Sequence, residues 1–459
     1  MNGYYLGLDL GTSSVKALLA NRDGVLCKEK EAYASATAKG WEDAVRRVIA
    51  RLSSCVGANA VLGIGLSSQV GTYLVDDGNI LHWWEAYGRD ELERIKNDVL
   101  QEEFLRDISM YHPDIISYPL PRLAYIKRNY PNVKRVRMPK ELLTEMLTGR
   151  CVSDPYSWRG VYNFERKDYA RGLLERLKLD MELPALVSPT DVAGYVNEQA
   201  AKTLGLNVGT PVYTGMNDFF SGLLGMGVIH AGDCFEISGT SEHVGFIGEE
   251  ICKDAPVSGH YLRHYVTYGG TKSSGASCDL ALRELDARGL DVGFAPSVHT
   301  PIFLPYLRGE RAPIYDENAR GVFFGMDADT TRADLAYAVL EGVTFSLYDV
   351  ASRMDMPKGG KLITGGGSAK DALMARIKAE LFQKEILACK EGDTSALGAA
   401  LTAMIGAGAY ADYEEAASGV EYEACALPMG KDRQHLLWRF ERYRSLYPTL
   451  KNEFKKWNE

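Results

Sequence analysis

The stretch that decides the fold is residues 6–20, Leu-Gly-Leu-Asp-Leu-Gly-Thr-Ser-Ser-Val-Lys-Ala-Leu-Leu-Ala, and a weaker copy, Phe-Glu-Ile-Ser-Gly-Thr-Ser-Glu-His-Val-Gly-Phe-Ile, recurs at 235–247. In both, an alternating apolar run meets a Gly-Thr-Ser turn and a second alternating run leaves it, which predicts strand, turn and strand. Backbone amides and hydroxyls in such turns suit phosphate oxygens. Because the copies lie about half a chain apart, they predict two duplicated lobes that hold a polyphosphate between them.

The bulk composition is that of an ordinary globular protein with more than one domain. The chain has 459 residues, of which 46% are hydrophobic and 25% charged, and a single core rarely grows to this length. The net charge of −9 argues against a general binder of nucleic acids or membrane surfaces, which would carry a basic field. Phosphate binding is still compatible with this charge, because backbone amides and a few local cations suffice for it.

The cysteines and the hydropathy pattern predict a cytoplasmic protein. The eight cysteines are scattered without a Cys-x-x-Cys pair, and a chain with this much core does not need disulfides, so reduced thiols are expected. Asp9 and Lys16 interrupt the apolar start, which argues against a signal peptide. No window approaches about 18 uncharged apolar residues, so no membrane-spanning helix is expected.

The order of predicted elements places a domain boundary near residue 230. The first half is predicted to contain strands within 4–33 and at 61–66 and 209–215, and helices at 41–52, within 90–150 and at 219–228. The second half repeats this order, with strands at 234–247 and 362–364 and helices at 277–285, 331–354, 371–382, 394–407 and 432–457. The sequence therefore predicts an N-terminal domain of residues 1–229 and a C-terminal domain of residues 230–459.

The first Gly-Thr-Ser turn carries the chemistry that a metal-bound phosphate needs. It combines backbone amides, hydroxyls, one cation and one carboxylate, supplied by Asp9, Gly11, Thr12, Ser13 and Lys16. Amides and hydroxyls suit phosphate oxygens, and a carboxylate suits Mg²⁺ directly or through water. A plain hairpin turn also needs glycine for its backbone angles. The copy at Gly239 and Thr240 favours the phosphate site over the plain turn.

A run of three glycines in the second half follows a predicted strand and precedes a helix. Gly366 and Gly367 would let a flat ligand such as an adenine nucleotide approach the backbone, because no Cβ atom is in the way. Three glycines also make an ordinary turn. The chain has neither a Walker pattern nor a Gly-x-Gly-x-x-Gly that opens a helix, which argues against a nicotinamide-dependent oxidoreductase.

Asp218 lies just past a predicted strand, at the start of the small-residue helix. A carboxylate there suits a general base that accepts the proton of an alcohol. An aspartate at the start of a helix is more often its N-cap. Together with the two phosphate turns, the base is the favoured interpretation.

Four further stretches resemble the sequence signatures of a known protein family. They are residues 117–129, with Arg122 and Tyr125 where Lys and Trp are usual, residues 304–313, residues 321–341 and residues 362–370. With them, the chain is similar to the FGGY family of carbohydrate kinases, within the actin-like ATPase superfamily, from Asp9 to about Gly408. The resemblance implies an α/β fold of two actin-like, ribonuclease H-like lobes. Each lobe would have a mixed five-stranded sheet flanked by helices, with an active-site cleft between the lobes.

The resemblance implies a role for each matching position. Asp218 matches the catalytic base, and Asp9 matches the acidic residue near Mg²⁺. Phosphate-contacting positions are matched by Thr12, Ser13, Thr240 and Gly275, and adenosine-contacting positions by Gly366, Gly367 and Lys370. The sugar-contacting segments of the family correspond to those around Gln69, Trp84 and Asp154.

Departures from the family pattern concentrate on the sugar side. Where the family has a Trp-x-Asp-x-Arg-like element, this chain has Trp-Trp-Glu-Ala-Tyr-Gly-Arg at 83–89, and whether Glu85 or Arg89 contacts the sugar is open at this point. Glu242 and His243 follow the second turn, where small or apolar residues are usual. His243 is either a substrate contact or a hydrogen-bonded strand histidine.

The sequence thus predicts a kinase that transfers the γ-phosphoryl group of MgATP to a hydroxyl of a small sugar or polyol, with a ketose such as xylulose or ribulose favoured. Glycerol is disfavoured because no paired arginines follow Trp84. ATP and Mg²⁺ are the expected cofactors, and neither nucleic acid nor a membrane is an expected partner. The sequence leaves open whether the protein forms a homodimer. An actin-like ATP-binding sugar sensor without kinase activity is the alternative.

Overall fold

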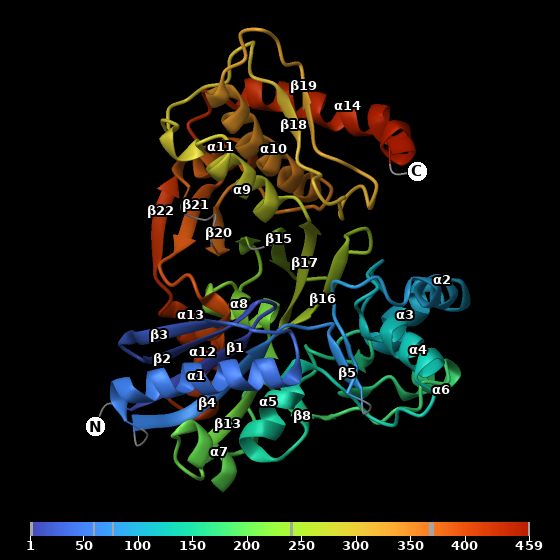
Figure 1. Cartoon of the computed structure of the whole chain (residues 1–459), viewed down its shortest axis with the longest axis vertical. Coiled ribbons are helices and arrows are strands. Elements are labelled where there is room, and N and C mark those ends of the chain that lie inside the picture. The colour runs from blue at the N-terminus through green and yellow to red at the C-terminus, as the bar shows by residue number, and fades with distance from the viewer. Residues whose placement is uncertain (1–2, 58–59, 76–77, 239–241, 367–370, 458–459) are drawn as a thin grey trace. The chain divides into compact units, whose positions relative to one another are not determined.

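The structure is a computed structural model that describes residues 3–57, 60–75, 78–238, 242–366 and 371–457 (Figure 1). Its contacts divide the chain into two compact units. The first unit comprises Met1–Ile229, Gly259–Arg263 and Asp393–Val420, and the second comprises His230–Ser258, His264–Gly392 and Glu421–Glu459. The chain therefore leaves the first unit beside the predicted boundary, but two later segments return to that unit.

Among the described residues, the first unit is built on a six-stranded mixed sheet in the order β12-β13-β4-β1-β2-β3. Its strands are β1 (Tyr4–Leu10), β2 (Ser14–Asn21), β3 (Gly24–Ala32), β4 (Val61–Ser68), β12 (Val192–Tyr195) and β13 (Pro211–Asn217). β1 pairs antiparallel with β2 and parallel with β4, and β4 pairs parallel with β13. The predicted strand–turn–strand at 6–20 is confirmed as the hairpin of β1 and β2.

Helices cover both faces of this sheet, which explains why its central strands are buried. On one face, apolar side chains of β1 pack against α1 (Ala38–Val56). On the other face, Leu18 and Ala20 pack against α12 (Thr394–Gly406). Gly7 permits this contact, because a Cβ atom there would lie 2.0 Å from the carbonyl oxygen of Ala396. Asp393–Val420 thus belongs to the first unit because α12 covers its sheet, although the sequence placed this segment in the C-terminal domain.

The rest of the first unit consists of short elements, several of which carry candidate site residues. They are β5 (Tyr73–Val75), β6 (Ile80–Leu81), α2 (Arg89–Asp98), α3 (Gln101–Ile108), α4 (Pro119–Asn129), β7 (Val136–Arg137), α5 (Pro139–Thr148), β8 (Val152–Ser153), β9 (Tyr162–Asn163), β10 (Asp168–Tyr169), α6 (Arg171–Arg176), β11 (Ala185–Leu186), α7 (Glu198–Leu204), α8 (Asp218–Gly225) and α13 (Tyr413–Ser418). The helices from α2 to α5 confirm the mainly helical character predicted for residues 90–150.

Among the described residues, the second unit is built on a seven-stranded sheet in the order β16-β17-β15-β14-β20-β21-β22, although the residues of β16 from Gly259 onward are counted with the first unit. Its strands are β14 (Cys234–Ser238), β15 (Glu242–Gly248), β16 (Val257–Tyr261), β17 (His264–Thr271), β20 (Lys361–Gly366), β21 (Glu385–Cys389) and β22 (Tyr422–Ala426). The unit also contains α9 (Ser274–Arg283), α10 (Arg332–Ser352), α11 (Ala372–Phe382), α14 (Arg433–Trp457) and the hairpin of β18 (Ile302–Leu304) and β19 (Val322–Phe324). No helix in the described part of the chain is both long and apolar enough to cross a membrane.

The two sheets repeat one topology, as the duplicated turns predicted. The strands β3-β2-β1-β4-β13-β12 correspond in order to β17-β15-β14-β20-β21-β22, with the same parallel and antiparallel pairings. The described sheets exceed the expected five strands, because an antiparallel edge strand, β12 or β22, is added to each and β16 is added to the second. Edge strands this short give little periodic signal in a sequence.

Candidate active site

Three parallel strands of the first unit end at the same edge of the sheet and bring candidate residues together. Across β1, β4 and β13, Asp9 is the partner of Ser67, and Ser67 is the partner of Met216. Gln69 follows the end of β4, and Asp218 follows the end of β13. The carboxyl ends of parallel strands are where α/β sheets bind their ligands. Asp9, Gln69 and Asp218, which were predicted to bind the metal, to bind the sugar and to act as the base, thus lie at or next to the same edge of the sheet.

Asp9 is a buried carboxylate with little positive charge at hand. Only 5% of its surface is exposed, and its Oδ1 accepts a hydrogen bond of 2.7 Å from the Ser67 hydroxyl. Burial raises the pKa of Asp9; Ser67 and Lys16 oppose this rise, and the nearby Asp393 adds to it. A divalent cation would supply the positive charge that this carboxylate lacks.

The ammonium group of Lys16 pairs with a carboxylate from a distant part of the chain. Its Nζ lies 2.9 Å from Oδ1 of Asp393, and Nζ of Lys28 lies 3.6 Å from the other oxygen of that carboxylate. Burial alone would raise the pKa of Asp393, but the two lysines outweigh it and the pKa is lowered. Asp393 immediately precedes α12 and lies far from Lys16 in the sequence. No local sequence pattern could therefore predict this ion pair. Lys16 was predicted to meet phosphate, and in this structure it meets Asp393.

Thr12 and Ser13 present exposed side chains on a turn that is tied to its surroundings. The hydroxyl of Tyr33 donates to the carbonyl of Gly11 at 2.9 Å. The Thr12 hydroxyl accepts a hydrogen bond of 3.1 Å from the indole Nε1 of Trp83. This bond joins the first Gly-Thr-Ser turn to the tryptophan-containing segment of the predicted sugar side, a contact that the sequence did not predict.

Asp218 is the first residue of α8, but it does not cap that helix. The N-cap is Asn217, whose side chain accepts a hydrogen bond of 3.1 Å from the N–H of Phe220. The alternative interpretation of Asp218 as an N-cap is therefore wrong. The residue is partly exposed, and its carboxylate accepts a hydrogen bond of 2.8 Å from the N–H of Phe219. Burial, and then the negative charge of Asp9, raise the pKa of Asp218 to about 7.

Gln69 offers a buried amide donor to this region. The residue is 2% exposed, and its Oε1 accepts a hydrogen bond of 3.4 Å from the Thr72 hydroxyl. Its Nε2 has no hydrogen-bond partner among the described residues. Buried polar atoms are rarely left unpaired, so an unpaired one calls for a water or a ligand to complete its contacts.

In the segment that resembles the Trp-x-Asp-x-Arg element, the charged side chains have local partners and an exposed tryptophan has a stacking partner. Trp84 is 46% exposed and stacks on His82 with ring centroids 4.3 Å apart. Glu85 accepts a hydrogen bond of 2.7 Å from the N–H of His82, and Arg89 pairs with Asp114 at 3.6 Å. Because both charged side chains have local partners, Trp84 is the stronger candidate for a ligand contact.

Arg122 holds the turn that carries Trp84, a role that the sequence did not reveal. The residue has no exposed surface, and its Nη2 donates to the carbonyls of His82, Trp83 and Glu85 at 3.2, 3.4 and 2.6 Å. One signal was present in the sequence, since Arg122 replaces the lysine usual in the resembled family. Its meaning depends on the packing of α4 against this turn, which no local pattern encodes.

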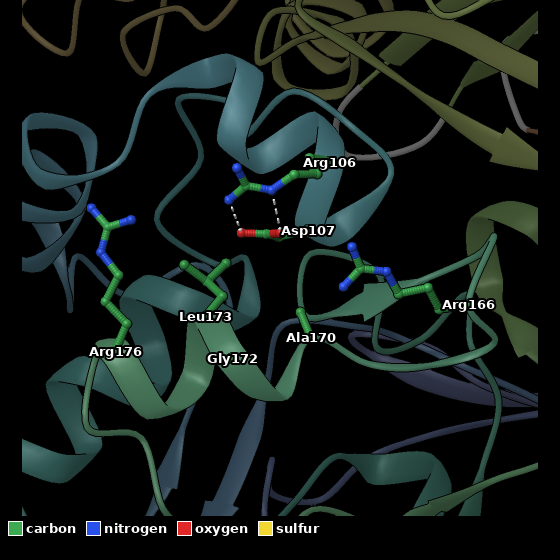
Figure 2. Close-up of a pocket in the computed structure, with 7 residues that line it drawn as sticks. All are labelled: Arg106, Asp107, Arg166, Ala170, Gly172, Leu173 and Arg176. Atoms are coloured by element: carbon green, nitrogen blue, oxygen red, sulfur yellow. Dashed lines mark hydrogen bonds and ion pairs between the residues drawn. The ribbon is translucent and has the colours of Figure 1, made fainter.

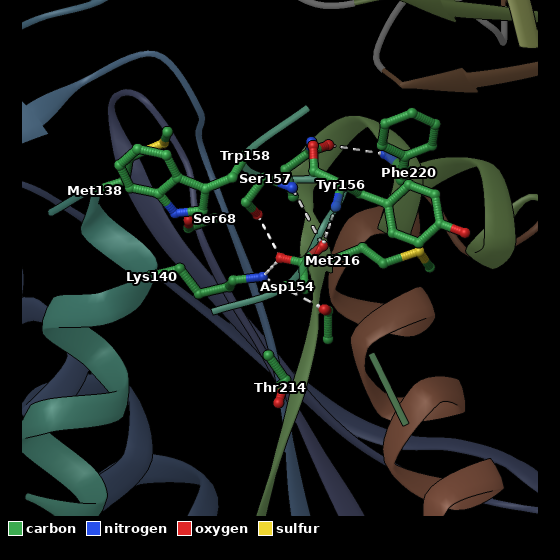
Figure 3. A network of polar contacts seen from close by, with 12 residues as sticks. Ser68, Met138, Lys140, Asp154, Tyr156, Ser157, Trp158, Thr214, Met216 and Phe220 are labelled. Atoms are coloured by element: carbon green, nitrogen blue, oxygen red, sulfur yellow. Dashed lines mark hydrogen bonds and ion pairs between the residues drawn. The ribbon is translucent and has the colours of Figure 1, made fainter. Parts of the chain in front are cut away.

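Asp154 is fully engaged in a buried polar network (Figure 3). Its Oδ1 accepts a hydrogen bond of 2.8 Å from the N–H of Tyr156, and its Oδ2 accepts one of 2.6 Å from the Ser157 hydroxyl and one from the Lys140 ammonium. Lys140 also donates to the carbonyl of Gly215 in β13 at 3.3 Å. Asp154 is 0% exposed. This geometry does not support the predicted sugar contact by Asp154, because both of its oxygens are occupied and buried; it instead ties α5 to the strand that leads to Asp218.

In the second unit, the ends of β14 and β20 lie side by side. Ser238, the last residue of β14, is the partner of Gly366 at the end of β20. Gly366 has a φ of +97°, and a Cβ atom there would lie 1.9 Å from the carbonyl oxygen of Ser238, so this position requires glycine. The second Gly-Thr-Ser turn and the glycine run therefore follow adjacent strand ends. Four predicted residues lie outside the described ones: Gly239, Thr240, Gly367 and Lys370.

His243 and Gly275 are the other predicted residues of the second unit. The His243 ring packs edge-on against Tyr268 with centroids 5.8 Å apart, and Gly270 on β17 leaves room for it, because a Cβ atom there would lie 2.9 Å from its Nε2. This packing favours the strand histidine over a substrate contact. Gly275 is the second residue of α9, and the first turn of a helix is a common phosphate-binding position.

A buried charge cluster shared by β14, β15 and α11 was not predicted. Nζ of Lys378 in α11 lies 2.5 Å from Oε1 of Glu236 and 3.6 Å from Oε1 of Glu242, and none of the three side chains is more than 2% exposed. Burial raises the pKa of Glu242 well above its ordinary value, although Lys378 opposes this rise. Glu242, a departure from the family pattern, is thus an internal residue of this unit.

Known proteins resemble the chain over nearly its whole length. Models of the FGGY family of carbohydrate kinases match residues 4–225 as the N-terminal domain and residues 236–407 as the C-terminal domain. The chain is 26% identical over 482 residues to a xylulose kinase of Staphylococcus xylosus, which covers 97% of this chain and 99% of that relative. Two solved structures from Lactobacillus acidophilus are each 25% identical: a ligand-bound xylulose kinase, with a TM-score of 0.86, and a gluconate kinase, with a TM-score of 0.85. Each match covers 99% of this chain, and 100% and 99% of those structures, respectively.

Proposed function

The chain belongs to the FGGY family of carbohydrate kinases and is an ATP-dependent sugar kinase, and we propose that its substrate is a ketose, with xylulose as the first candidate. Relatives and solved structures named as xylulose kinases support this choice. A sugar acid is the second candidate, because the resemblance to the gluconate kinase structure is nearly as close.

The proposed catalytic base is Asp218, and its placement is the observation that carries the mechanism. It follows β13 at the sheet edge that β1 and Asp9 share, and Asn217 caps α8 in its stead. A pKa of about 7 leaves a large fraction ionised at neutral pH while keeping the group basic enough to accept a proton. The carboxylate would take the proton of the sugar hydroxyl as that oxygen attacks the γ-phosphorus of ATP.

The proposed phosphate contacts of the first unit come from the turn at Gly11, Thr12 and Ser13. We assign Mg²⁺ to Asp9, directly or through water, because the pKa of this buried carboxylate is raised and the nearby charge of Lys16 does not offset the rise. The ion, when bound, would neutralise charge on the phosphate groups. The proposed ATP contacts of the second unit, carried by the family resemblance, are Gly239, Thr240, Gly275, Gly366, Gly367 and Lys370. Lys16 stays a proposed phosphate contact that would have to exchange Asp393 for a phosphate oxygen.

Gln69 and Trp84 are the favoured sugar contacts. The buried Nε2 of Gln69 would donate to a sugar oxygen, and the exposed ring of Trp84 would offer a flat face to the C–H groups of the sugar. Glu85, Arg89 and His243 are weaker candidates because each already packs or pairs within its own region. Asp154 would act indirectly, by holding the strand that leads to Asp218.

A coupled assay of ADP release tests the choice of substrate. Full-length protein with MgATP would be given D-xylulose, L-xylulose, D-ribulose, D-gluconate or glycerol, each compared with a sample that lacks sugar. We expect ketose-dependent ADP formation with the highest kcat/KM for a xylulose. A preference for gluconate would support the second candidate, and slow hydrolysis that is indifferent to every sugar would favour the sensor alternative.

The substitution Asp218→Asn tests the base. Asparagine keeps the shape of the side chain and can accept the same bond from Phe219, so ATP affinity by calorimetry should stay near normal. We expect kcat to fall by about 10²–10⁴, the usual contribution of a general base. Asp254→Asn, at an exposed carboxylate, is the matched control and should keep full activity. Near-normal turnover of Asp218→Asn would remove this residue from the mechanism.

A further inference from the structure

A pocket of about 250 Å³ lies in the first unit, on elements that do not contribute to the candidate active site (Figure 2). It is lined by residues from the end of α3, from the turn between β9 and β10, and from α6 with the residue before it: Arg106, Asp107, Arg166, Ala170, Gly172, Leu173 and Arg176. In Figure 2 the Arg106–Asp107 pair lies between Arg176 on one side and Arg166 on the other, above Leu173. The pocket thus combines three guanidinium groups with a small apolar floor.

One buried asparagine ties the two rims of this pocket together. Asn163 is 1% exposed, and its Nδ2 donates to the carbonyls of Arg106 and Asp107 at 2.9 and 3.2 Å. Its Oδ1 accepts from the N–H groups of Glu165 and Arg166 at 3.0 and 2.8 Å. The turn that carries Arg166 is therefore fixed to the end of α3, which sets the backbone positions of two of the arginines before any ligand binds.

Two of the three guanidinium groups are held in place by carboxylates. Arg106 makes two hydrogen bonds to Asp107, of 2.8 and 2.9 Å, and Arg176 donates to Glu103 at 2.8 Å and to the carbonyl of Asp98. The guanidinium of Arg166 makes no hydrogen bond or ion pair with the described residues, although its charge reaches Asp107. The hydrogen bond from Arg106, followed by the charges of Arg106, Arg166 and Arg176, lowers the pKa of Asp107. All three guanidinium groups thus act electrostatically on Asp107, but only that of Arg106 bonds to it.

The charges that line the pocket leave an excess of positive charge. Three arginines face one aspartate, and Glu103 compensates a second arginine from outside the lining. The remaining positive charge lies at Arg166, whose guanidinium has no ion-pair partner among the described residues. Guanidinium groups with fixed planes are suited to the tetrahedral oxygens of phosphate, which they bind through two parallel N–H donors.

We propose that this pocket binds the phosphate group of a small phosphate monoester or of inorganic phosphate, at a site separate from that of the sugar kinase reaction. The phosphate oxygens would take up the free donors of Arg166 and the outward-facing donors of Arg106 and Arg176. Ala170 and Leu173 would contact any organic part of the ligand. The site is independent of the proposed kinase function, because none of its residues belongs to that mechanism.

Isothermal titration of the full-length protein with inorganic phosphate and with glycerol 3-phosphate tests this site. Arg166→Gln removes the uncompensated charge without breaking an ion pair of the described structure, and we expect it to weaken binding of both probes by about tenfold. Arg171→Gln is the matched control, because Arg171 lies on α6 but pairs with Asp168, at 3.1 and 3.2 Å, and does not line the pocket. It should change the affinity by less than about twofold.

The two probes and the two variants give distinct outcomes. Equal affinity for both probes would identify the phosphate group alone as the ligand, and tighter binding of glycerol 3-phosphate would add a contact to its organic part. Unchanged affinity in Arg166→Gln would overturn the proposal, because binding would then occur elsewhere, such as the active site. An equal loss in Arg166→Gln and Arg171→Gln would also overturn it, because the effect would then be one of general charge. Both variants should keep the kcat of the wild-type kinase.

Discussion

At the scale of single residues, the proposed chemistry depends on two neighbouring residues with different roles: Asn217 caps α8, and Asp218 is the proposed base. The amide oxygen of Asn217 caps α8, so the neighbouring carboxylate is not needed for that purpose. Burial and the charge of Asp9 then raise the pKa of Asp218 to about 7. A carboxylate that capped the helix would instead be held ionised by backbone N–H groups, with a lower pKa and a weaker basicity.

The pH dependence of the reaction follows from this pKa. Because the base must be ionised to accept a proton, kcat/KM for the sugar should rise with pH and level off above about 7, where Asp218 has lost its proton. Steady-state kinetics on both sides of neutrality would measure the inflection. A profile that is flat through this range, or that falls where Asp218 ionises, would contradict the assignment of this residue as the base.

Asp154 is predicted to support the fold rather than to contact the sugar. Asp154→Asn leaves the Lys140 ammonium buried without its carboxylate, which should cost about 3–5 kcal/mol of the free energy of unfolding. Ser157→Ala, which removes one neutral donor to the same carboxylate, should cost only about 1 kcal/mol. Urea unfolding would measure both losses. An Asp154→Asn protein with normal stability and a raised KM for the sugar would restore the direct contact.

At the scale of elements, the hydrogen bond from Trp83 to Thr12 joins two segments with different proposed tasks. Trp83 lies on the turn that Arg122 holds through three carbonyls. The backbone N–H of Trp83 donates to the Thr72 hydroxyl at 3.2 Å. Thr12 lies on the proposed phosphate turn. The bond from Trp83 therefore connects the sugar-side segment directly to the Thr12 hydroxyl, which contacts ATP in the proposed mechanism.

Trp83→Phe is expected to loosen this link while leaving the turn folded. Phenylalanine keeps the aromatic packing but lacks the indole N–H, so Thr12 loses one partner. We expect kcat for sugar phosphorylation to fall several-fold. The rate of ATP hydrolysis without sugar should rise relative to the rate of phosphoryl transfer to the sugar. Trp84→Phe is the matched control, because it keeps the bond to Thr12 and should mainly raise KM for the sugar. Equal behaviour of the two variants would argue against a separate role for Trp83.

The glycine at the end of β20 gives a second prediction at this scale. Gly366→Ala places a Cβ atom 1.9 Å from the carbonyl of Ser238 at a φ of +97°, a strain of about 1–3 kcal/mol that must displace the strand end. Gly360→Ala is the control, since its φ of +73° is also positive but nothing lies within 4 Å of the added atom. Kinetics should show a raised KM for ATP in Gly366→Ala alone, with KM for the sugar unchanged. A normal KM for ATP would separate this turn from nucleotide binding.

At the scale of the whole molecule, one topology is used twice, but the chain does not divide cleanly into halves. Six strands recur in the same order in both units. The first unit nevertheless depends on α12, which comes from the second half of the sequence and covers one face of its sheet. Glycines make these contacts close: a Cβ atom at Gly65 in β4 would lie 1.8 Å from the carbonyl oxygen of Ala399 in α12, and one at Gly398 in α12 would lie 1.8 Å from the carbonyl oxygen of Ser221 in α8, the helix that packs beside it.

Gly398→Ala should therefore destabilise the first unit from a position in the second half of the sequence. Overpacking of this kind costs about 1–3 kcal/mol, and hydrogen exchange should show faster opening of β1 and β4 than in the wild type. Gly419→Ala lies in the same returning segment, but its nearest neighbour would be 3.7 Å away, so its thermal unfolding should stay close to that of the wild type. Unchanged exchange in β1 and β4 of Gly398→Ala would show that α12 does not hold this sheet.

The sequence by itself determined those features that are written into short local patterns. The alternation around two Gly-Thr-Ser turns predicted the hairpins and the duplication, and Thr331 and Asp334 as opening residues predicted the long helix α10. The strand before Asp218 and the helix after it placed this carboxylate at a strand end. These predictions succeed because backbone geometry and the burial of one face act within a few residues of each other.

Only the tertiary structure decided which charged and polar groups are free to act. It paired Lys16 with Asp393, enclosed Asp154 with Lys140, set Arg122 against the carbonyls of a distant turn, and gave the capping task to Asn217. It also gathered the arginines of the proposed phosphate pocket from three separate elements. Hydrogen bonds and desolvation depend on which groups packing brings within a few ångströms, and residues that lie far apart along a chain carry no shared pattern that records this proximity.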